Sequence, residues 1–295
     1  MTLVEFFGAI AKLSGLLFVV TSMVAMGLSL TVPQIIAPLR NVRLVILALF
    51  ANFVLVPLIA YVIVRVIPLG EPLRIGLILL ATAAGAPFLP KLVQVAKGDI
   101  AFGVGLMVLL MVVTIIYMPI VLPLLLPGVQ VDPWAIAQSL ILLMLIPLGI
   151  ALFIRAQAPE TAATFQPVMN KASSLAILVL LVVGLGLNVS NILSLIGTGG
   201  IFALLLFIIA TFALGFVFGG RDPGIRSVMG PGTAQRNISA ALVVGAQNFT
   251  DPNVLTTLLV GAILLLLLLL PTARQLGSRA KAPAAGSVVE PAAGS

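Results

Sequence analysis

The stretch GAPFLPKLVQVAKGD, residues Gly85–Asp99, decides the fold because it places two prolines and a lysine within an apolar region. Proline removes a backbone hydrogen-bond donor and breaks or kinks a helix. A lysine near the middle of a bilayer costs about 2.5 to 3.5 kcal/mol on insertion scales. Lys91, which lies between Pro87 and Gln94 and directly follows Pro90, is therefore expected to face a cavity or a polar partner. The alternative is a segment short enough for the lysine to reach an interface.

The sequence around this stretch has the composition of a membrane protein. The chain has 295 residues, of which 61% are hydrophobic and 8% charged, and its mean hydropathy is +1.30. Runs such as Leu44–Val64 and Ile100–Leu126 are long enough to cross about 30 Å of hydrocarbon as helices. Backbone groups in lipid must pair within the segment, which favours helices. The sequence thus predicts an all-α polytopic membrane protein embedded in a lipid bilayer.

The residue types that are missing exclude most catalytic classes. The sequence has no cysteine and no histidine, which removes thiolate and imidazole chemistry and the usual zinc and haem ligands. No carboxylate lies deep in an apolar run, so neither a proton relay nor an intramembrane enzyme site is expected. The 15 basic residues are spread among loops rather than clustered with aromatic residues, which argues against nucleic-acid binding. We therefore expect no enzyme activity, no metal site and no cofactor.

Glycine, proline and charged residues divide the apolar sequence into ten predicted spans. The outer loops of this arrangement carry only two basic residues, Arg40 and Arg43. By the positive-inside rule we expect both termini in the cytoplasm, with the chain in a bacterial inner (plasma) membrane. Residues 277–295 are small and proline-rich, and are expected to form a disordered cytoplasmic tail. The spans are predicted near residues 10–30, 44–66, 73–86, 87–97, 100–126, 134–155, 173–193, 200–219, 225–248 and 252–271.

A second interrupted segment, Arg226–Phe249, resembles the first in its breaks and in the single cation within its apolar part. Gly230, Pro231 and Gly232 provide the predicted break, and Arg236 follows it. A helix that restarts here directs its N–H groups and its positive dipole end into the middle of the membrane, which favours an anion. The alternative is that the arginine pairs with a carbonyl at a helix end and only holds the crossing together. Three further polar residues flank it: Thr233, Gln235 and Asn237.

The two interrupted segments occupy corresponding places in the two halves of the chain. Five predicted spans in each half, an odd number, require the halves to be inverted relative to each other. Short segments interrupted by glycine and proline at matching places in inverted halves indicate the binding site of a transporter.

The same segments resemble the bile acid:sodium symporter family, as a divergent prokaryotic-type member. The resemblance is carried by PFLPKLVQVAKGDIAFGVGLM (Pro87–Met107) and GTAQRNISAALVVGAQNF (Gly232–Phe249) and extends over nearly all of residues 1–276. It implies a single transmembrane domain with an inverted five-plus-five repeat, two broken and crossing helices, and transport of organic anions. It also implies a panel of about residues 1–70 and 131–195, and a core of about 71–130 and 196–276.

The sodium sites of the family are only partly matched. Typical members offer a Ser-Asn pair at the first crossing, where this chain has Leu89 and Pro90. They carry a Glu and a Gln-Asn pair at the second, where this chain has Gly232, Arg236 and Asn237. Sodium requires several hard oxygen ligands. The hypothesis is that the lysine and the arginine occupy the place of bound sodium, which argues against sodium coupling.

The predicted function is secondary active or facilitative transport of a small organic anion by alternating access. The alternative is a non-transporting sensor or receptor built on a transporter scaffold, which a flux measurement beside a binding measurement would distinguish. The residues predicted to bind the substrate are Lys91, Gln94, Thr233, Gln235, Arg236 and Asn237.

Overall fold

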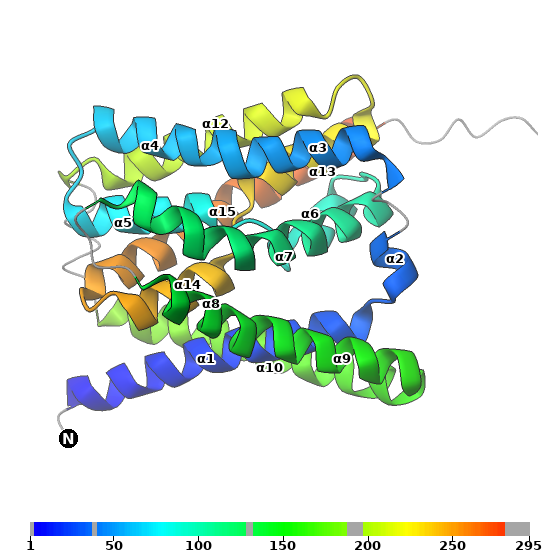
Figure 1. Ribbon diagram of the computed structural model, residues 1–295, viewed down its shortest axis with the longest axis horizontal. Helices are drawn as coiled ribbons and strands as arrows, with labels where there is room; N and C mark the ends of the chain where they lie inside the picture. Colours follow the sequence, from blue (N-terminus) through cyan, green and yellow to red (C-terminus); the bar gives the residue numbers. More distant parts are fainter. Residues whose placement is uncertain (1–2, 37–39, 128–131, 188–196, 281–295) are drawn as a thin grey trace, which may run out of the picture.

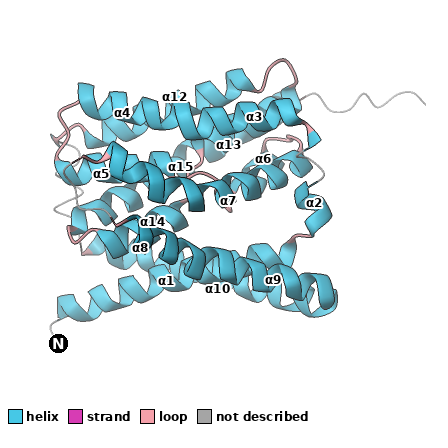
Figure 2. Cartoon of the chain, in the orientation of Figure 1, coloured by secondary structure: helices cyan, strands magenta, loops and turns pink. Residues whose placement is uncertain are grey.

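The computed structural model describes residues 3–36, 40–127, 132–187 and 197–280, and every regular element in these ranges is a helix (Figure 2). Seven segments of this part are long and apolar enough to cross a membrane. The prediction of an all-helical polytopic membrane protein is therefore confirmed. Five of these segments are single helices: α1 (Leu3–Ser29), α7 (Ile100–Leu125), α10 (Pro159–Gly186), α12 (Gly200–Phe218) and α15 (Pro252–Arg279).

The other two long segments contain one wide helical turn each. The first runs through α3 (Val42–Phe50), the π-helical turn η2 (Ala51–Leu55) and α4 (Val56–Val66). The second runs through α8 (Pro133–Leu140), the π-helical turn η3 (Ile141–Leu145) and α9 (Ile146–Gln157). In both, a proline is the second residue after the wide turn. A proline inside a helix lacks its N–H and clashes with the preceding turn, and the π-helical turn accommodates it.

Two further passages are broken pairs of short helices. The first consists of α5 (Glu71–Thr82) and α6 (Leu89–Val95), and the second of α13 (Pro223–Ala234) and α14 (Ile238–Asn248). Even the 12 residues of α5 rise only about 18 Å as a helix, too little to cross a bilayer. Residues 73–97, which the sequence analysis divided into two spans, therefore form one broken passage. The described residues make nine passages rather than ten.

This odd number places the two ends of the described chain on opposite sides of the bundle. Helix α1 begins at the left of Figure 1, whereas α15 ends at the right. There Gly277 of α15 packs against Val95 at the end of α6. The ten-span prediction places these two ends on one side, so the nine passages of the described residues differ from it in this respect.

The helices pack in groups (Figure 1). Helices α1, α9 and α10 pack against one another, while α5, α7, α14 and α15 lie between them and α12. The α3–α4 segment packs against α5, α7 and α12. This differs from the expected panel of residues 1–70, because α3–α4 joins the helices assigned to the core. A short helix, α2 (Val32–Ile36), connects α1 to α3.

Two segments are more helical than the sequence analysis expected. Helix α10 begins at Pro159, so residues 159–172, predicted as a connection, are helical. Helix α15 continues to Arg279, so residues 277–279 of the predicted tail are helical, and residues 281–295 lie outside the described part. Exposed apolar side chains on α7 repeat every four residues and form a lipid-facing stripe. They are Val112, Ile116, Ile120 and Leu124.

Candidate functional site

Asn237 fastens the two broken passages together. Its backbone N–H donates to the carbonyl of Ala83 at 2.8 Å, and its side-chain Nδ2 donates to the carbonyl of Gly85 at 3.0 Å. Its Oδ1 accepts a hydrogen bond from the N–H of Ala240 at 3.0 Å and so caps the start of α14. One buried side chain therefore determines both where α14 begins and where it meets the break between α5 and α6.

The first break depends on glycine and on a threonine from α7. Gly85 has φ +79°, and a Cβ added there would overlap the backbone of Met111. Thr114 of α7 donates its hydroxyl to the carbonyl of Ala84 at 3.1 Å and accepts from the N–H of the same residue at 3.0 Å. These contacts satisfy backbone groups that a helix would otherwise pair. Pro87 lies in the connection, and Pro90 is the second residue of α6, where proline is tolerated.

The second break lies a few residues beyond its predicted position. Gly230, Pro231 and Gly232 are part of α13, which ends at Ala234, and the non-helical residues are 235–237. The two glycines allow close packing against Phe212 and Leu89. The missing N–H of the proline removes one intrahelical hydrogen bond but does not end the helix here.

Arg236 is entirely buried at the crossing. Its Nε donates to the carbonyl of Leu80 at 3.0 Å, and its Nη2 donates to the carbonyl of Ala81 at 3.0 Å. Its Nη1 donates to Asn52 Oδ1 and to the carbonyl of Thr233, both at 2.9 Å. The three carbonyls belong to the last turns of α5 and α13, where unpaired oxygens and the negative dipole end favour a cation.

The buried contacts change the roles expected of three residues. The guanidinium of Arg236 has no exposed surface and uses four of its five N–H donors on the protein itself. Thr233 and Asn237 are also buried and are not among the residues that line the cavity. Thr233 and Asn237 therefore do not reach the cavity in this conformation, whereas Arg236 borders it without exposed surface, and substrate contact by these residues stays a prediction. The alternative, in which the arginine holds the crossing together, matches the observed hydrogen bonds.

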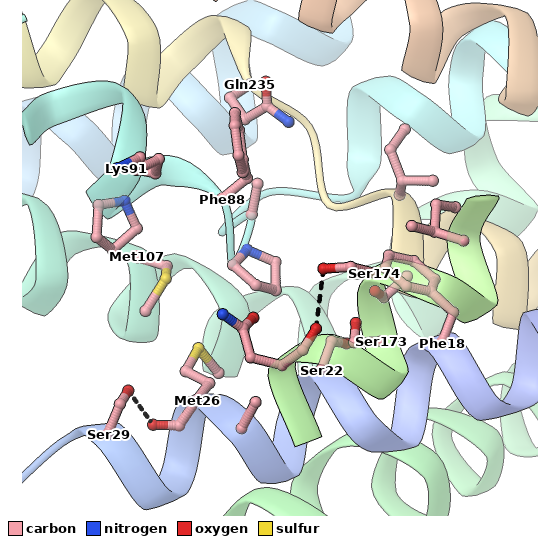
Figure 3. A pocket seen from close by; sticks show the side chains of 18 of the residues that line it. Phe18, Ser22, Met26, Ser29, Phe88, Lys91, Met107, Ser173, Ser174 and Gln235 are labelled. Carbon is pink, nitrogen blue, oxygen red and sulfur yellow. Dashed lines mark hydrogen bonds between the residues drawn. The ribbon is translucent and has the colours of Figure 1, made fainter. Parts of the chain in front are cut away.

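A cavity of about 810 Å³ lies next to the crossing, between α1 and α10 on one side and α6, α7 and α14 on the other (Figure 3). Four residues that were predicted to bind substrate line it: Lys91, Gln94, Gln235 and Arg236, the last without exposed surface. Lys91 is exposed, and its Nζ donates to Gln94 Oε1 at 3.2 Å. The described residues that line the cavity include no Asp or Glu. The cavity therefore carries net positive charge.

Two buried polar atoms in the wall of this cavity have no hydrogen-bond partner. They are Gln235 Oε1 and Ser239 Oγ, and their residues are 5% and 1% exposed. Ser239 lies in the first turn of α14, whose N-terminal N–H groups carry partial positive charge, and Gln235 lies in the break just before it. An unpaired buried polar atom costs about 1 to 3 kcal/mol, so a bound polar group is favoured here.

Sequence reasoning missed the residues that α1 and α10 contribute to the cavity. Those on α10 recur with helical spacing on one face, a signal that was overlooked because residues 159–172 were read as a connection. Hydroxyl and amide side chains dominate the set (Figure 3). The polar members are Ser22 and Ser29 on α1, and Gln166, Asn170, Ser173 and Ser174 on α10.

Broken passages that meet beside a cavity are an arrangement found in membrane transporters. The chain belongs to the Sodium Bile acid symporter family, whose sequence profile matches residues 16–195. This match includes the α5–α6 break, and Arg236 lies beyond it. Members of this family are transporters and not enzymes.

A plant protein is similar to this chain over most of the chain's length. It is the probable sodium/metabolite cotransporter BASS3 of the chloroplast of Arabidopsis thaliana, 26% identical over 241 residues. The match covers 81% of this chain and 54% of the plant protein, so the chain spans about half the length of that relative.

Proposed function

We propose that this chain carries a small organic anion across the membrane by alternating access. The observation that supports this most directly is the composition of the cavity. It contains the exposed cation of Lys91 and the unpaired polar atoms of Gln235 and Ser239, and no acidic residue among the described lining. An anion there would receive the lysine charge and the hydroxyl proton of the serine, next to the positive end of α14.

The substrate class follows from the size and lining of the cavity. A volume of about 810 Å³ lies within the range of roughly 300 to 1,000 Å³ that is usual for small-molecule sites. Phe18, Met26 and Met107 supply apolar walls, while serine and amide side chains face them (Figure 3). This arrangement suits an anion with an apolar body and additional hydroxyl or carbonyl groups.

The charges at the two ends of the bundle support an orientation. The end that contains the α9–α10 and α12–α13 connections, at the right of Figure 1, carries most of the basic residues, and the opposite end carries Arg65 and Arg74. By the positive-inside rule the right end faces the cytoplasm, with α1 beginning outside. The residues of α1 and α7 that line the cavity lie in the halves of these helices nearer to the right end. This conformation is therefore inward-facing. The basic residues are Arg40, Arg43, Lys97, Arg155, Arg221, Arg226, Arg274 and Arg279.

The moving parts that we propose follow the packing rather than the sequence-based division. Helices α1, α9 and α10 form one body, and the crossing helices with α3–α4, α7, α12 and α15 form the other. The α5–α6 and α13–α14 pairs run in opposite directions (Figure 1), as inverted repeats require. In this plan four passages of each half correspond, and α8–α9 has no partner among the described residues.

Uptake into proteoliposomes and thermal unfolding with a set of monocarboxylates, dicarboxylates and sulfate esters would test the proposal. At least one anion class should raise the unfolding temperature and exchange across the membrane. Binding without flux would favour the sensor or receptor alternative. No stabilisation and no flux by any anion would contradict the proposal.

The lysine of the cavity provides a sharper test with a matched control. Lys91→Met should raise the apparent KM for the anion about tenfold or more, because a charge-assisted hydrogen bond contributes about 1.5 to 3 kcal/mol. Lys91→Arg keeps the charge and should retain most of the uptake. Equal kinetics in Lys91→Met and the unaltered protein would show that the lysine does not contact the anion.

A further inference from the structure

Arg236 has the surroundings of a bound metal cation. Its guanidinium is enclosed by neutral oxygens, the carbonyls of Leu80, Ala81 and Thr233 and the amide oxygen of Asn52, at 2.9 to 3.0 Å. Unwound helix ends that present carbonyl oxygens at mid-membrane are the groups with which carriers bind sodium. Here a side chain of the protein itself fills this position.

The partial negative charges of the helix ends at the crossing are also balanced by one cation. The C-terminal ends of α5 and α13 each carry about half a negative charge, and together they match a single guanidinium. An arginine side chain remains protonated in proteins. A sodium ion among the same oxygens would therefore meet an unscreened like charge, and its ligands are already used by the arginine.

The cation is also unable to leave with the substrate. Arg236 has no exposed surface, and the adjacent Asn237 is bonded to Ala83 and Gly85 across the break. In this conformation the positive charge is therefore held at the crossing by the chain itself. It can therefore neutralise the helix ends but cannot draw energy from an ion gradient.

We propose that Arg236 is a built-in substitute for a coupling cation, and that anion transport by this chain does not use sodium. This proposal rests on the proposed function for the transport itself. Sodium binding is tested separately, because it can be measured on the purified protein with no anion present.

The first experiment compares thermal unfolding of the unaltered protein in NaCl, KCl and choline chloride at equal ionic strength. The three unfolding temperatures should agree within about 1 °C, because there is no vacant cation position at the crossing to fill. A specific rise in NaCl, or a severalfold loss of anion flux when choline replaces sodium, would overturn the proposal. A lack of anion flux under all conditions would instead count against the proposed function.

The second experiment removes the arginine side chain and so vacates the cation position at the crossing. Arg236→Ala leaves three carbonyls and one amide oxygen without their donor, and should lower the unfolding temperature by about 5 °C or more. Sodium should then restore part of this loss relative to choline, since the variant presents an oxygen cage of the kind that sodium prefers. If the Arg236→Ala protein folds and does not respond to sodium, the arginine has only a structural role, and the proposal is overturned.

Asn52→Ala is the matched control, because it removes one acceptor but keeps the arginine. It should be mildly destabilised and remain indifferent to sodium. A sodium response in Asn52→Ala would show a cation site that the arginine does not occupy, and would contradict the proposal even if Arg236→Ala does not fold.

Discussion

At the scale of single residues, the crossing depends on buried side chains that bond mostly to backbone groups. Arg236 and Asn237 are adjacent in sequence but act on different helix ends, the first on the last turns of α5 and α13 and the second on the break and on α14. Both are fully buried. Removing such a side chain leaves buried partners without hydrogen bonds, which is more costly than losing an exposed contact.

Asn237→Ala should therefore destabilise the protein by about 2 to 4 kcal/mol, because it removes a helix cap and leaves the carbonyl of Gly85 unpaired. Thermal unfolding in detergent measures the change. Asn41→Ala is the control, since Asn41 caps α3 by accepting from Leu44 at an exposed position, and should cost only about 1 kcal/mol. Similar losses in the two variants would show that Asn237 does not join the two passages.

At the scale of elements, the α5–α6 break is built by its neighbour α7 as much as by its own prolines. Thr114 satisfies the backbone of Ala84, and the backbone of Met111 approaches Gly85 too closely for any side chain there. Glycine is also the residue that adopts the positive φ of this position without strain. The prolines favour an interruption, and packing against α7 decides where it falls.

Gly85→Ala should lower stability by more than about 3 kcal/mol, because it combines backbone strain with overlap against Met111. Gly149→Ala on α9 is the control. Nothing lies near its added methyl group, so it should be neutral or slightly stabilising through helix propensity. Unfolding temperatures and gel-filtration profiles would compare the two, and a well-behaved Gly85→Ala protein would contradict the role assigned to this glycine.

At the scale of the whole molecule, joining α5 and α6 into one passage changes the sides on which the early connections lie. In the ten-span prediction, the connection near residues 36–42 lies outside the cell and the connection near residues 66–71 lies inside. With nine passages and the proposed orientation, the first connection lies inside and the second lies outside. The later connections stay on the same sides in both plans. The early connections are therefore the informative places to probe.

Because the sequence contains no cysteine, single cysteines can be introduced without removing others. With a membrane-impermeant maleimide applied to intact cells, Gly70→Cys should react, while Asn41→Cys should react only after permeabilisation. Both positions are exposed. If Asn41→Cys reacts in intact cells and Gly70→Cys reacts only after permeabilisation, the ten-span topology with both termini in the cytoplasm is supported. The proposed topology is then contradicted.

Much of the fold and part of the site could be predicted from local sequence. Long apolar runs specify membrane helices through the cost of burying polar groups in lipid, and Pro87, Pro90 and Lys91 marked the first break and one wall of the cavity. Local patterns were insufficient where length had to be judged in three dimensions. Residues 73–86 and 87–97 each look like an apolar span, but the helices that they form, α5 and α6, are each too short to cross a bilayer and together make one passage.

The sequence by itself determined that the protein is a helical membrane protein, because composition and apolar run length act through solvation alone. Its interrupted segments and its family resemblance indicated a transporter. The tertiary structure decided what Arg236 does. Its partners Asn52, Leu80 and Ala81 lie more than 150 residues away, and three of its four acceptors are backbone carbonyls. Every residue type carries such a carbonyl, so no sequence pattern marks the ones that an arginine will find.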